Sequence, residues 1–122
     1  GKANISYGGY YCNPAGLSEI PRTSPVGYYT ANGYALYDMA GNVWEWCNDW
    51  YDEGYYEWTK NTCGEPCPNP TGPRSTSRRV LRGGSWGYDV RYCRVAGRDR
   101  YGWPLSRCEH LGFRPVLAFA GR

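Results

Sequence analysis

The residues best suited to binding chemistry lie between Arg82 and Arg114. Large aromatic, carboxylate and imidazole side chains occur there without the period of a helix or a strand. Tyrosine and tryptophan offer a large contact area at a small cost in rotamer entropy, and small polar residues adapt their hydrogen bonds to a partner. The alternative is that these aromatic residues are simply the core of an aromatic-rich protein. We predict that the segment contacts a ligand through Tyr88, Asp89, Tyr92, Asp99, Tyr101, Trp103, Leu105 and His110.

A second set of residues in the same segment has the character of a scaffold. Glycine allows tight turns, and the planar guanidinium of arginine has five donors that can tie together backbone without regular strands. The contact residues should face outward from this frame. We expect the following residues to be buried or held in place: Gly83, Gly84, Trp86, Arg91, Arg94, Arg98, Gly112, Phe113 and Arg114.

The elements that position this segment are predicted to be short. The 122 residues include 17 glycines and 9 prolines, which interrupt the chain often and favour loops and short strands over long helices. Residues 36–39 are expected to form a tight loop or a turn of helix. Residues 1–33 and 53–77 are expected to be loops, the second an insertion without a chemical role. Apolar and alternating patterns predict strands over 43–47, 79–82, 93–96 and 113–119.

Charge is distributed unevenly along the chain. Residues 38–65 contain seven acidic residues and one lysine, whereas residues 74–114 contain ten arginines and three acidic residues. We expect the two segments to pair inside one fold; the alternative is a basic surface for an anionic partner. The arginines stand singly and no reader motif occurs, so no nucleic-acid partner is expected. No apolar run is long enough to span a membrane, so membrane insertion is not expected either.

The six cysteines leave several chemical states open. Cys63 and Cys67 form a C-x3-C pattern in a loop rich in proline, which fits either a local disulfide or two free thiols. Zinc would need further ligands, and the single histidine, His110, lies far along the chain. Cys47 and Cys93 have aromatic or apolar neighbours and are expected to be small buried hydrophobic residues.

Three motifs occur in order: N-G-Y-A-L-Y-D-M-A-G-N-V-W-E-W at 32–46, R-V-L-R-G-G-S-W at 79–86 and L-G-F-R at 111–114. Together they resemble the C-terminal half of the formylglycine-generating-enzyme (sulfatase-modifying factor) domain family. The resemblance implies a loop-rich α+β fold that is C-type-lectin-like, with short mixed strands and little helix, as a single abbreviated domain over 1–122. Family members carry a preceding half, so it also implies either a second chain that completes the fold or an abbreviated version.

The resemblance does not extend to the catalytic centre of the family. Catalytic members oxidise a substrate cysteine with two closely spaced cysteines that bind copper, shortly after the Gly-Gly-Ser-Trp motif. The corresponding region here, 86–93, is shorter, and Cys93 falls on neither catalytic position when counted back from Arg98. Cys108 lies much later, so no thiolate pair is placed to bind copper. We therefore expect no enzyme and no copper; the alternative is a formylglycine-generating-type oxidoreductase or a fragment of one.

The segment is similar to the variable region of proteins diversified by retroelements, many of which have C-type-lectin-like folds. That region opens near R-G-G-S-W, closes near G-F-R, and carries residues that arise when asparagine codons are randomised at adenines. Most residues that lie between the frame residues of 82–114 belong to this set, although Trp103 and Glu109 do not. The resemblance implies a noncatalytic binding protein that displays residues 87–110 to a protein or another surface ligand. Its location would be a cell or virion surface, and otherwise the cytoplasm.

Calcium is the cofactor that the resemblance suggests. The family often holds this ion near the G-N-x-W-E-W motif, which here supplies Asn42 and Glu45. An amide oxygen, a carboxylate and backbone carbonyls are hard ligands that suit Ca²⁺. The alternative is that Glu45 pairs only with an arginine of the frame.

Overall fold

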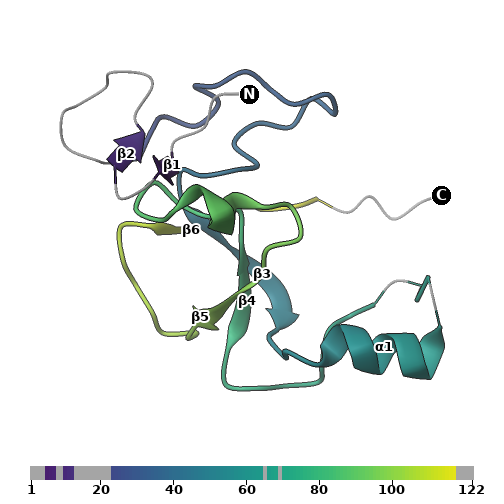
Figure 1. Ribbon diagram of the computed structural model, residues 1–122. Coiled ribbons are helices and arrows are strands. Elements are labelled where there is room, and N and C mark those ends of the chain that lie inside the picture. The colour runs from purple at the N-terminus through teal and green to yellow at the C-terminus, as the bar shows by residue number, and fades with distance from the viewer. Residues whose placement is uncertain (1–4, 8–9, 13–22, 65, 69, 118–122) are drawn as a thin grey trace.

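A four-stranded mixed sheet forms the centre of the protein (Figure 1). The computed structural model describes residues 5–7, 10–12, 23–64, 66–68 and 70–117. The strand order is β5-β4-β3-β6; β4 pairs antiparallel with β3 and β5, and β3 pairs parallel with β6. The bounds are β3 Trp44–Trp50, β4 Arg79–Arg82, β5 Asp99–Gly102 and β6 Leu111–Phe113.

The two central strands were the best predicted elements. β4 has the predicted bounds, and β3 covers most of the predicted strand and extends to Trp50. Among the described residues, the buried apolar side chains are Tyr29, Trp44, Val80 and Leu81, so the core is small and centred on these strands. Within the described part of the chain, no helix is long and apolar enough to cross a membrane.

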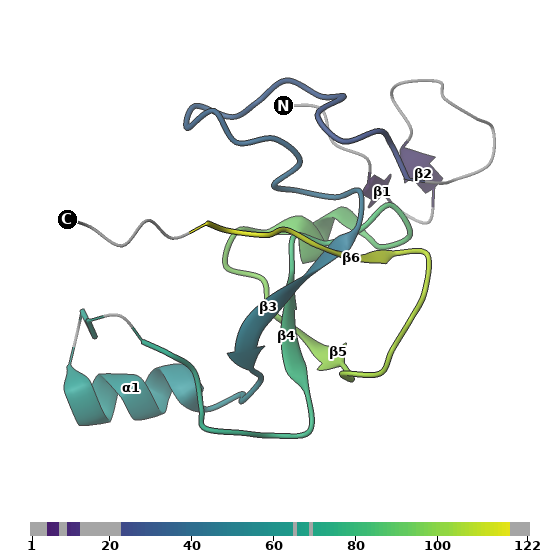
Figure 2. The same cartoon turned by 180° about the vertical axis from the view of Figure 1, so that it is seen from behind.

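The N-terminal region contains regular structure that the sequence did not predict. β1 (Ile5–Tyr7) and β2 (Tyr10–Cys12) form an antiparallel two-stranded sheet within the expected loop 1–33. β1 lies against η1, a 3₁₀ helix over Val90–Cys93 (Figures 1 and 2). Residues 36–39 form a loop, in which Asp38 has a left-handed φ of 53°.

The expected loop 53–77 contains a helix, α1, over Tyr55–Cys63. Its sequence has no apolar period, and Thr59 is the buried residue of the helix. α1 projects from the end of β3 (Figure 2), and a disulfide between Cys63 and Cys67 ties its last turn to the segment that returns to β4. The disulfide decides between the two states that the sequence left open for this pair.

Two predicted strands were misplaced. The expected strand over 93–96 is the end of η1 followed by a turn, because Gly97 N donates to Arg94 O at 2.7 Å and closes the chain on itself. The strand of this region, β5, begins later at Asp99. The expected strand over 113–119 is β6, which ends at Phe113; residues 118 and 119 lie outside the described residues.

Candidate functional site

Three predicted contact residues gather around the buried ring of Trp44. The ring centroid of Tyr88 lies 5.6 Å from that of Trp44, and Tyr92 lies 6.3 Å from Trp44 and 5.9 Å from Tyr88. His110 lies 5.3 Å from Tyr88. These steep edge-to-face arrangements are favourable geometries for aromatic rings. We call Trp44, Tyr88, Tyr92 and His110 the aromatic cluster. Trp44 lies in β3, Tyr88 in the turn before η1, Tyr92 in η1 and His110 in the chain before β6.

Partial burial changes the pKa of Tyr88, one of the outer residues of the aromatic cluster. Burial raises the pKa of the Tyr88 hydroxyl, and the negative charge of Asp99 raises it further. The Oδ1 atom of Asp99 accepts a hydrogen bond from Tyr101 N at 2.7 Å. Tyr88 remains a neutral hydroxyl at physiological pH, able to donate as well as to accept a hydrogen bond.

Asp89 organises the backbone of η1. Its Oδ1 accepts a hydrogen bond from Arg91 N at 3.0 Å, which caps the helix, and lies 3.3 Å from Arg91 Nε. The Arg91 side chain is 75% exposed, so this frame residue is held by its ion pair with Asp89 and not by burial.

The other predicted contact residues belong to β5 and the loop that follows it. Tyr101, Trp103 and Leu105 are 61%, 51% and 91% exposed. Ser106 N donates to Trp103 O at 2.8 Å, so the loop is held by its backbone rather than by these side chains. Within the described part of the chain, no ring contact joins this group to the aromatic cluster, so the predicted surface consists of two neighbouring groups.

Arginines and aromatic rings alternate beneath the exposed loop, a feature that sequence reasoning missed. The Cζ atom of Arg78 lies 5.5 Å from the ring centroid of Trp103 and 6.0 Å from that of Tyr51. The Cζ atom of Arg98 lies 5.0 Å from Tyr51 and 4.5 Å from Tyr56. Cation–π contacts of this kind contribute about 0.5–1 kcal/mol each at exposed sites. No sequence period links the five residues, so only the fold could place them together.

Most frame residues are held in place, chiefly through backbone and ring contacts. Arg98 donates to the carbonyl of Asp52 at 2.9 Å, and Arg82 to that of Val95 at 3.0 Å. Between the acidic and basic segments, the described ion pair is Arg114 with Glu45. The arginines of residues 74–114 therefore contact carbonyl groups and aromatic rings more often than the carboxylates of residues 38–65. Two frame predictions were wrong: Arg94 and Phe113 are exposed, because Arg94 follows η1 and Phe113 lies on an edge strand.

The predicted calcium residues bind protein groups. Asn42 Oδ1 accepts a hydrogen bond from Ser24 N at 2.9 Å. Both carboxylate oxygens of Glu45 accept hydrogen bonds from Arg114, at 3.0 and 2.7 Å. A guanidinium therefore occupies the side of the carboxylate that a cation would need, and the two residues do not fit a calcium site in this arrangement. Among the described residues, no group of three His, Cys, Asp or Glu side chains could hold a metal ion.

The three free cysteines of the described residues differ in environment. Burial raises the pKa of the half-buried Cys47 and Cys93 thiols. Both residues therefore resemble the small hydrophobic side chains that were expected, although neither is fully buried. Cys108 is exposed, and its Sγ lies 3.3 Å from His110 Nε2.

An apolar groove of about 720 Å³ opens on the sheet face that carries Glu45 and Arg82. Its lining includes exposed apolar side chains from three separate parts of the chain, and Arg94 and Arg114 add positive charge. This groove was not predicted, since its exposed apolar residues come from loops without a sequence period. The exposed apolar residues that line it are Tyr34, Leu36, Met39, Val95 and Val116.

Comparison with known proteins places this geometry in a family. The family model of the sulfatase-modifying factor enzyme 1-like domain matches residues 2–119. Formylglycine-generating enzyme from Streptomyces coelicolor is 44% identical over 95 residues, which cover 75% of this chain and 28% of that protein. The enzyme of the same name from Thermomonospora curvata is 37% identical over 116 residues, which cover 93% of this chain and 37% of that protein.

A solved structure, Treponema denticola variable protein 1, is also similar, with 39% sequence identity and a TM-score of 0.58. The match covers 75% of this chain and 31% of that chain. The chain thus spans between 28% and 37% of the length of these relatives. It belongs to the sulfatase-modifying factor enzyme 1-like domain family and has a C-type-lectin-like fold.

Proposed function

We propose that this chain is a noncatalytic ligand-binding domain that displays residues 87–110 as a variable surface. The proposal rests on one observation. Large side chains of this surface face solvent, whereas hydrogen bonds between backbone groups hold the chain that carries them. Tyr92, Tyr101, Trp103 and Leu105 are exposed, a costly arrangement for large apolar groups unless a partner covers them. The similarity to a protein named as a variable protein supports the same function.

Backbone hydrogen bonds hold most of this surface without its exposed contact side chains. The carboxylates of Asp89 and Asp99 are the exceptions, because they accept hydrogen bonds from Arg91 N and Tyr101 N. Tyr92 N donates to Asp89 O at 3.0 Å, and Leu111 N donates to Cys108 O at 3.1 Å. The turn at Gly97 and the loop at Ser106 are closed in the same way. The exposed side chains Tyr92, Tyr101, Trp103 and Leu105 can therefore change while the backbone persists, as a diversified binding surface requires.

The proposed ligand is a protein or another surface ligand. Exposed tyrosine and tryptophan with neighbouring polar groups suit a folded partner surface, as they do in antibody loops. We do not propose nucleic acid, because the arginines beneath the loop are engaged by rings and carbonyls. Residues 82–114 would be the variable segment, and display on a cell or virion surface would bring it to its partner.

A library tests this proposal directly. Positions 88, 92, 101, 103 and 105 are randomised, the chain is displayed, and binders to serum albumin are selected. The proposal expects that most variants remain folded and that specific binders emerge. A matched library at Gly84, Ser85, Gly102 and Gly112 should yield few folded variants. Equal folding losses in the two libraries would overturn the proposal.

The gene offers an independent test of diversification. A near-copy of the codons for 82–114, with asparagine codons at the contact positions and a reverse-transcriptase gene nearby, is the expected arrangement. A complete locus without such a copy would contradict the retroelement part of the proposal. Ligand binding itself would still be tested by the library.

The alternative function is that of a formylglycine-generating-type oxidoreductase or a fragment of one, and the names of the relatives favour it. The thiol chemistry argues against it, because burial raises the pKa of Cys47 and Cys93 and reduces their reactive thiolate fraction. Incubation with copper and a cysteine-containing sulfatase peptide separates the two functions. Conversion of the cysteine to formylglycine would establish the enzyme.

We also propose that a polypeptide segment outside residues 1–122 covers the apolar groove. The lining combines exposed apolar residues such as Met39 and Val116 with Arg94, which is exposed and makes no ion pair with any described residue. A segment with apolar side chains flanked by carboxylates would match this surface. The greater length of the relatives supports such a segment, whether it belongs to the same chain or to a second chain.

A further inference from the structure

A second pocket lies outside the 87–110 surface, between α1 and the segment that returns from the disulfide. Its volume is about 530 Å³, which is typical of small-molecule sites. The function proposed above gives this pocket no role. Its lining residues are Asp52, Gly54, Tyr55, Trp58, Gly72, Pro73 and Arg74.

Two aromatic rings form one wall of the pocket. Tyr55 and Trp58 are three residues apart in α1 and therefore share one face of the helix. Their rings stack, with centroids 5.7 Å apart and planes inclined by 26°. Trp58 is nevertheless 58% exposed, whereas Thr59 is the buried residue of the helix. The pocket thus has an aromatic surface that is open to a ligand.

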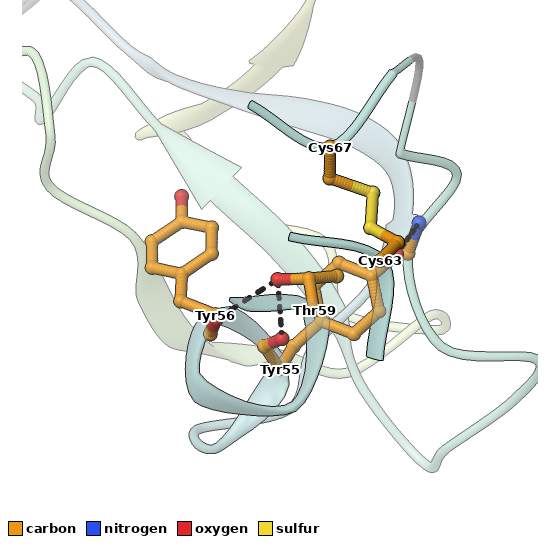
Figure 3. The surroundings of a disulfide bond; sticks show 6 residues. Tyr55, Tyr56, Thr59, Cys63 and Cys67 are labelled. Atoms are coloured by element: carbon orange, nitrogen blue, oxygen red, sulfur yellow. Dashed lines mark hydrogen bonds between the residues drawn. A yellow bond between two sulfur atoms is a disulfide. The ribbon is translucent and has the colours of Figure 1, made fainter. Parts of the chain in front are cut away.

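The facing wall is held against these rings by defined contacts. Gly72 N donates to the hydroxyl of Tyr55 at 3.0 Å, and the disulfide fixes the far end of the returning segment. Figure 3 shows Tyr55 and Thr59 beside the disulfide, with the Thr59 hydroxyl bonded to the carbonyls of the preceding turn. Gly72 has a φ of 80°, and a Cβ there would lie 3.1 Å from that of Asp49. The pocket is therefore preformed.

The chemistry of the lining points to a sugar ring. An aromatic face accepts the apolar C–H face of a pyranose, whose hydroxyl groups then need both acceptors and donors at the edge. The carboxylate of Asp52 supplies acceptors only, and the guanidinium of Arg74 supplies donors only. We propose that this pocket binds a neutral or amino pyranose, with the ring against Trp58 and hydroxyl or amino groups directed to Asp52.

Nucleotides are the main competing ligands, since bases also stack on aromatic side chains. Asp52 and Glu53 precede α1 and Glu57 lies in its first turn. These three carboxylates, against the single guanidinium of Arg74 in the lining, disfavour a phosphate near the pocket. An amino sugar has the opposite charge and would gain from the same carboxylates. The observations therefore favour the sugar over the nucleotide.

Nuclear magnetic resonance with the whole chain tests the proposal. The six tryptophans give indole N–H signals, and substitution assigns that of Trp58. Glucose, glucosamine and adenosine monophosphate are each added up to about 100 mM, where ligands of millimolar affinity saturate. We expect a saturable shift of the Trp58 signal with glucosamine and glucose. Absence of any saturable shift with both sugars, or a shift with the nucleotide alone, would overturn the proposal.

Three variants locate the site. Trp58→Ala should weaken sugar binding by at least about tenfold, the effect of losing one stacking contact. Asp52→Asn should weaken glucosamine binding more than glucose binding, because only the ammonium group loses a charge partner. Trp103→Ala, a matched change on the 87–110 surface, should leave sugar binding unchanged. Retention of binding in a folded Trp58→Ala protein would refute this site without affecting the function proposed for residues 87–110.

Discussion

Arg114 binds Glu45 across 69 residues of sequence, with Nε 3.0 Å from one carboxylate oxygen and Nη2 2.7 Å from the other. Arg114 Nη2 also donates to the carbonyl of Asp38 at 3.2 Å. One side chain thus joins the chain after β6, the central strand β3 and the loop before it. The contact also explains why Glu45 does not fit a calcium site in this arrangement, since the guanidinium already neutralises the carboxylate that the ion would use.

Removal of this contact should destabilise the fold. Arg114→Ala leaves the partly buried Glu45 carboxylate without its partner, and we expect the free energy of unfolding to fall by about 1–2 kcal/mol. The value is below that of a fully buried pair, because the side chains of Arg114 and Glu45 are 35% and 24% exposed. Urea denaturation followed by tryptophan fluorescence measures the change.

The matched control is Arg91→Ala. Arg91 also pairs with a carboxylate, that of Asp89, but its side chain is 75% exposed, so the loss should stay below about 0.5 kcal/mol. Equal losses in the two variants would show that the Arg114 contact has no special role in the fold.

The parts of the fold that could be predicted from sequence are those with a local period. β4 and most of β3 follow from apolar and alternating residues bounded by glycines. α1 could not be predicted, because its sequence has no apolar stripe. The helix depends instead on the stacking of Tyr55 with Trp58 and on the disulfide at its last residue, Cys63, and neither contact is visible as a periodic pattern.

The division between frame and contact residues was only partly predictable. Tyr101, Trp103 and Leu105 are exposed, as predicted, because their positions do not follow the period of a strand or helix with a buried face. Tyr88 was expected to face outward but is half-buried, because the turn from Ser85 to Tyr88 places its ring against Trp44. Phe113 shows the reverse error: an apolar residue on an edge strand is buried only if something covers that edge.

Substitution of Gly84 should be strongly destabilising. A Cβ at this position would collide with Cys93 Sγ and lie 3.1 Å from Cys93 backbone atoms, and the φ of 74° disfavours any L side chain. We expect Gly84→Ala to lower the free energy of unfolding by about 2–4 kcal/mol. Gly87→Ala is the control, because nothing lies within 4 Å of its Cβ, and it should change stability by less than about 0.5 kcal/mol.

Stability should fall at alkaline pH because of the two half-buried thiols. Burial raises the pKa of Cys47 and Cys93 in the folded protein, whereas an unfolded thiol has a pKa of about 8.5. This contribution to stability is fully present below about pH 8.5 and is lost as the pH rises through the folded values. Unfolding measured from pH 7 to pH 10 should show the decline.

The variant Cys47→Ala, Cys93→Ala should flatten that pH dependence. Alkylation at neutral pH gives a second readout, in which the exposed Cys108 should react before Cys47 and Cys93. Peptide mass spectrometry identifies the modified residues. Faster alkylation of Cys93 than of Cys108 would contradict the burial argument and would revive the oxidoreductase alternative.

The apolar groove should bind hydrophobic dyes when residues 1–122 are studied alone. We expect anilinonaphthalene sulfonate to fluoresce with the native chain, because exposed Met39 and Val116 line the groove and Arg94 attracts the sulfonate. The variant Met39→Gln, Val116→Ser should reduce this fluorescence by more than half while the urea midpoint stays similar. Leu105→Ser removes an equally exposed apolar residue from the other surface and should leave dye binding nearly unchanged. If the native chain does not bind the dye, or if the two sets of substitutions act alike, the groove is not the surface that another polypeptide covers.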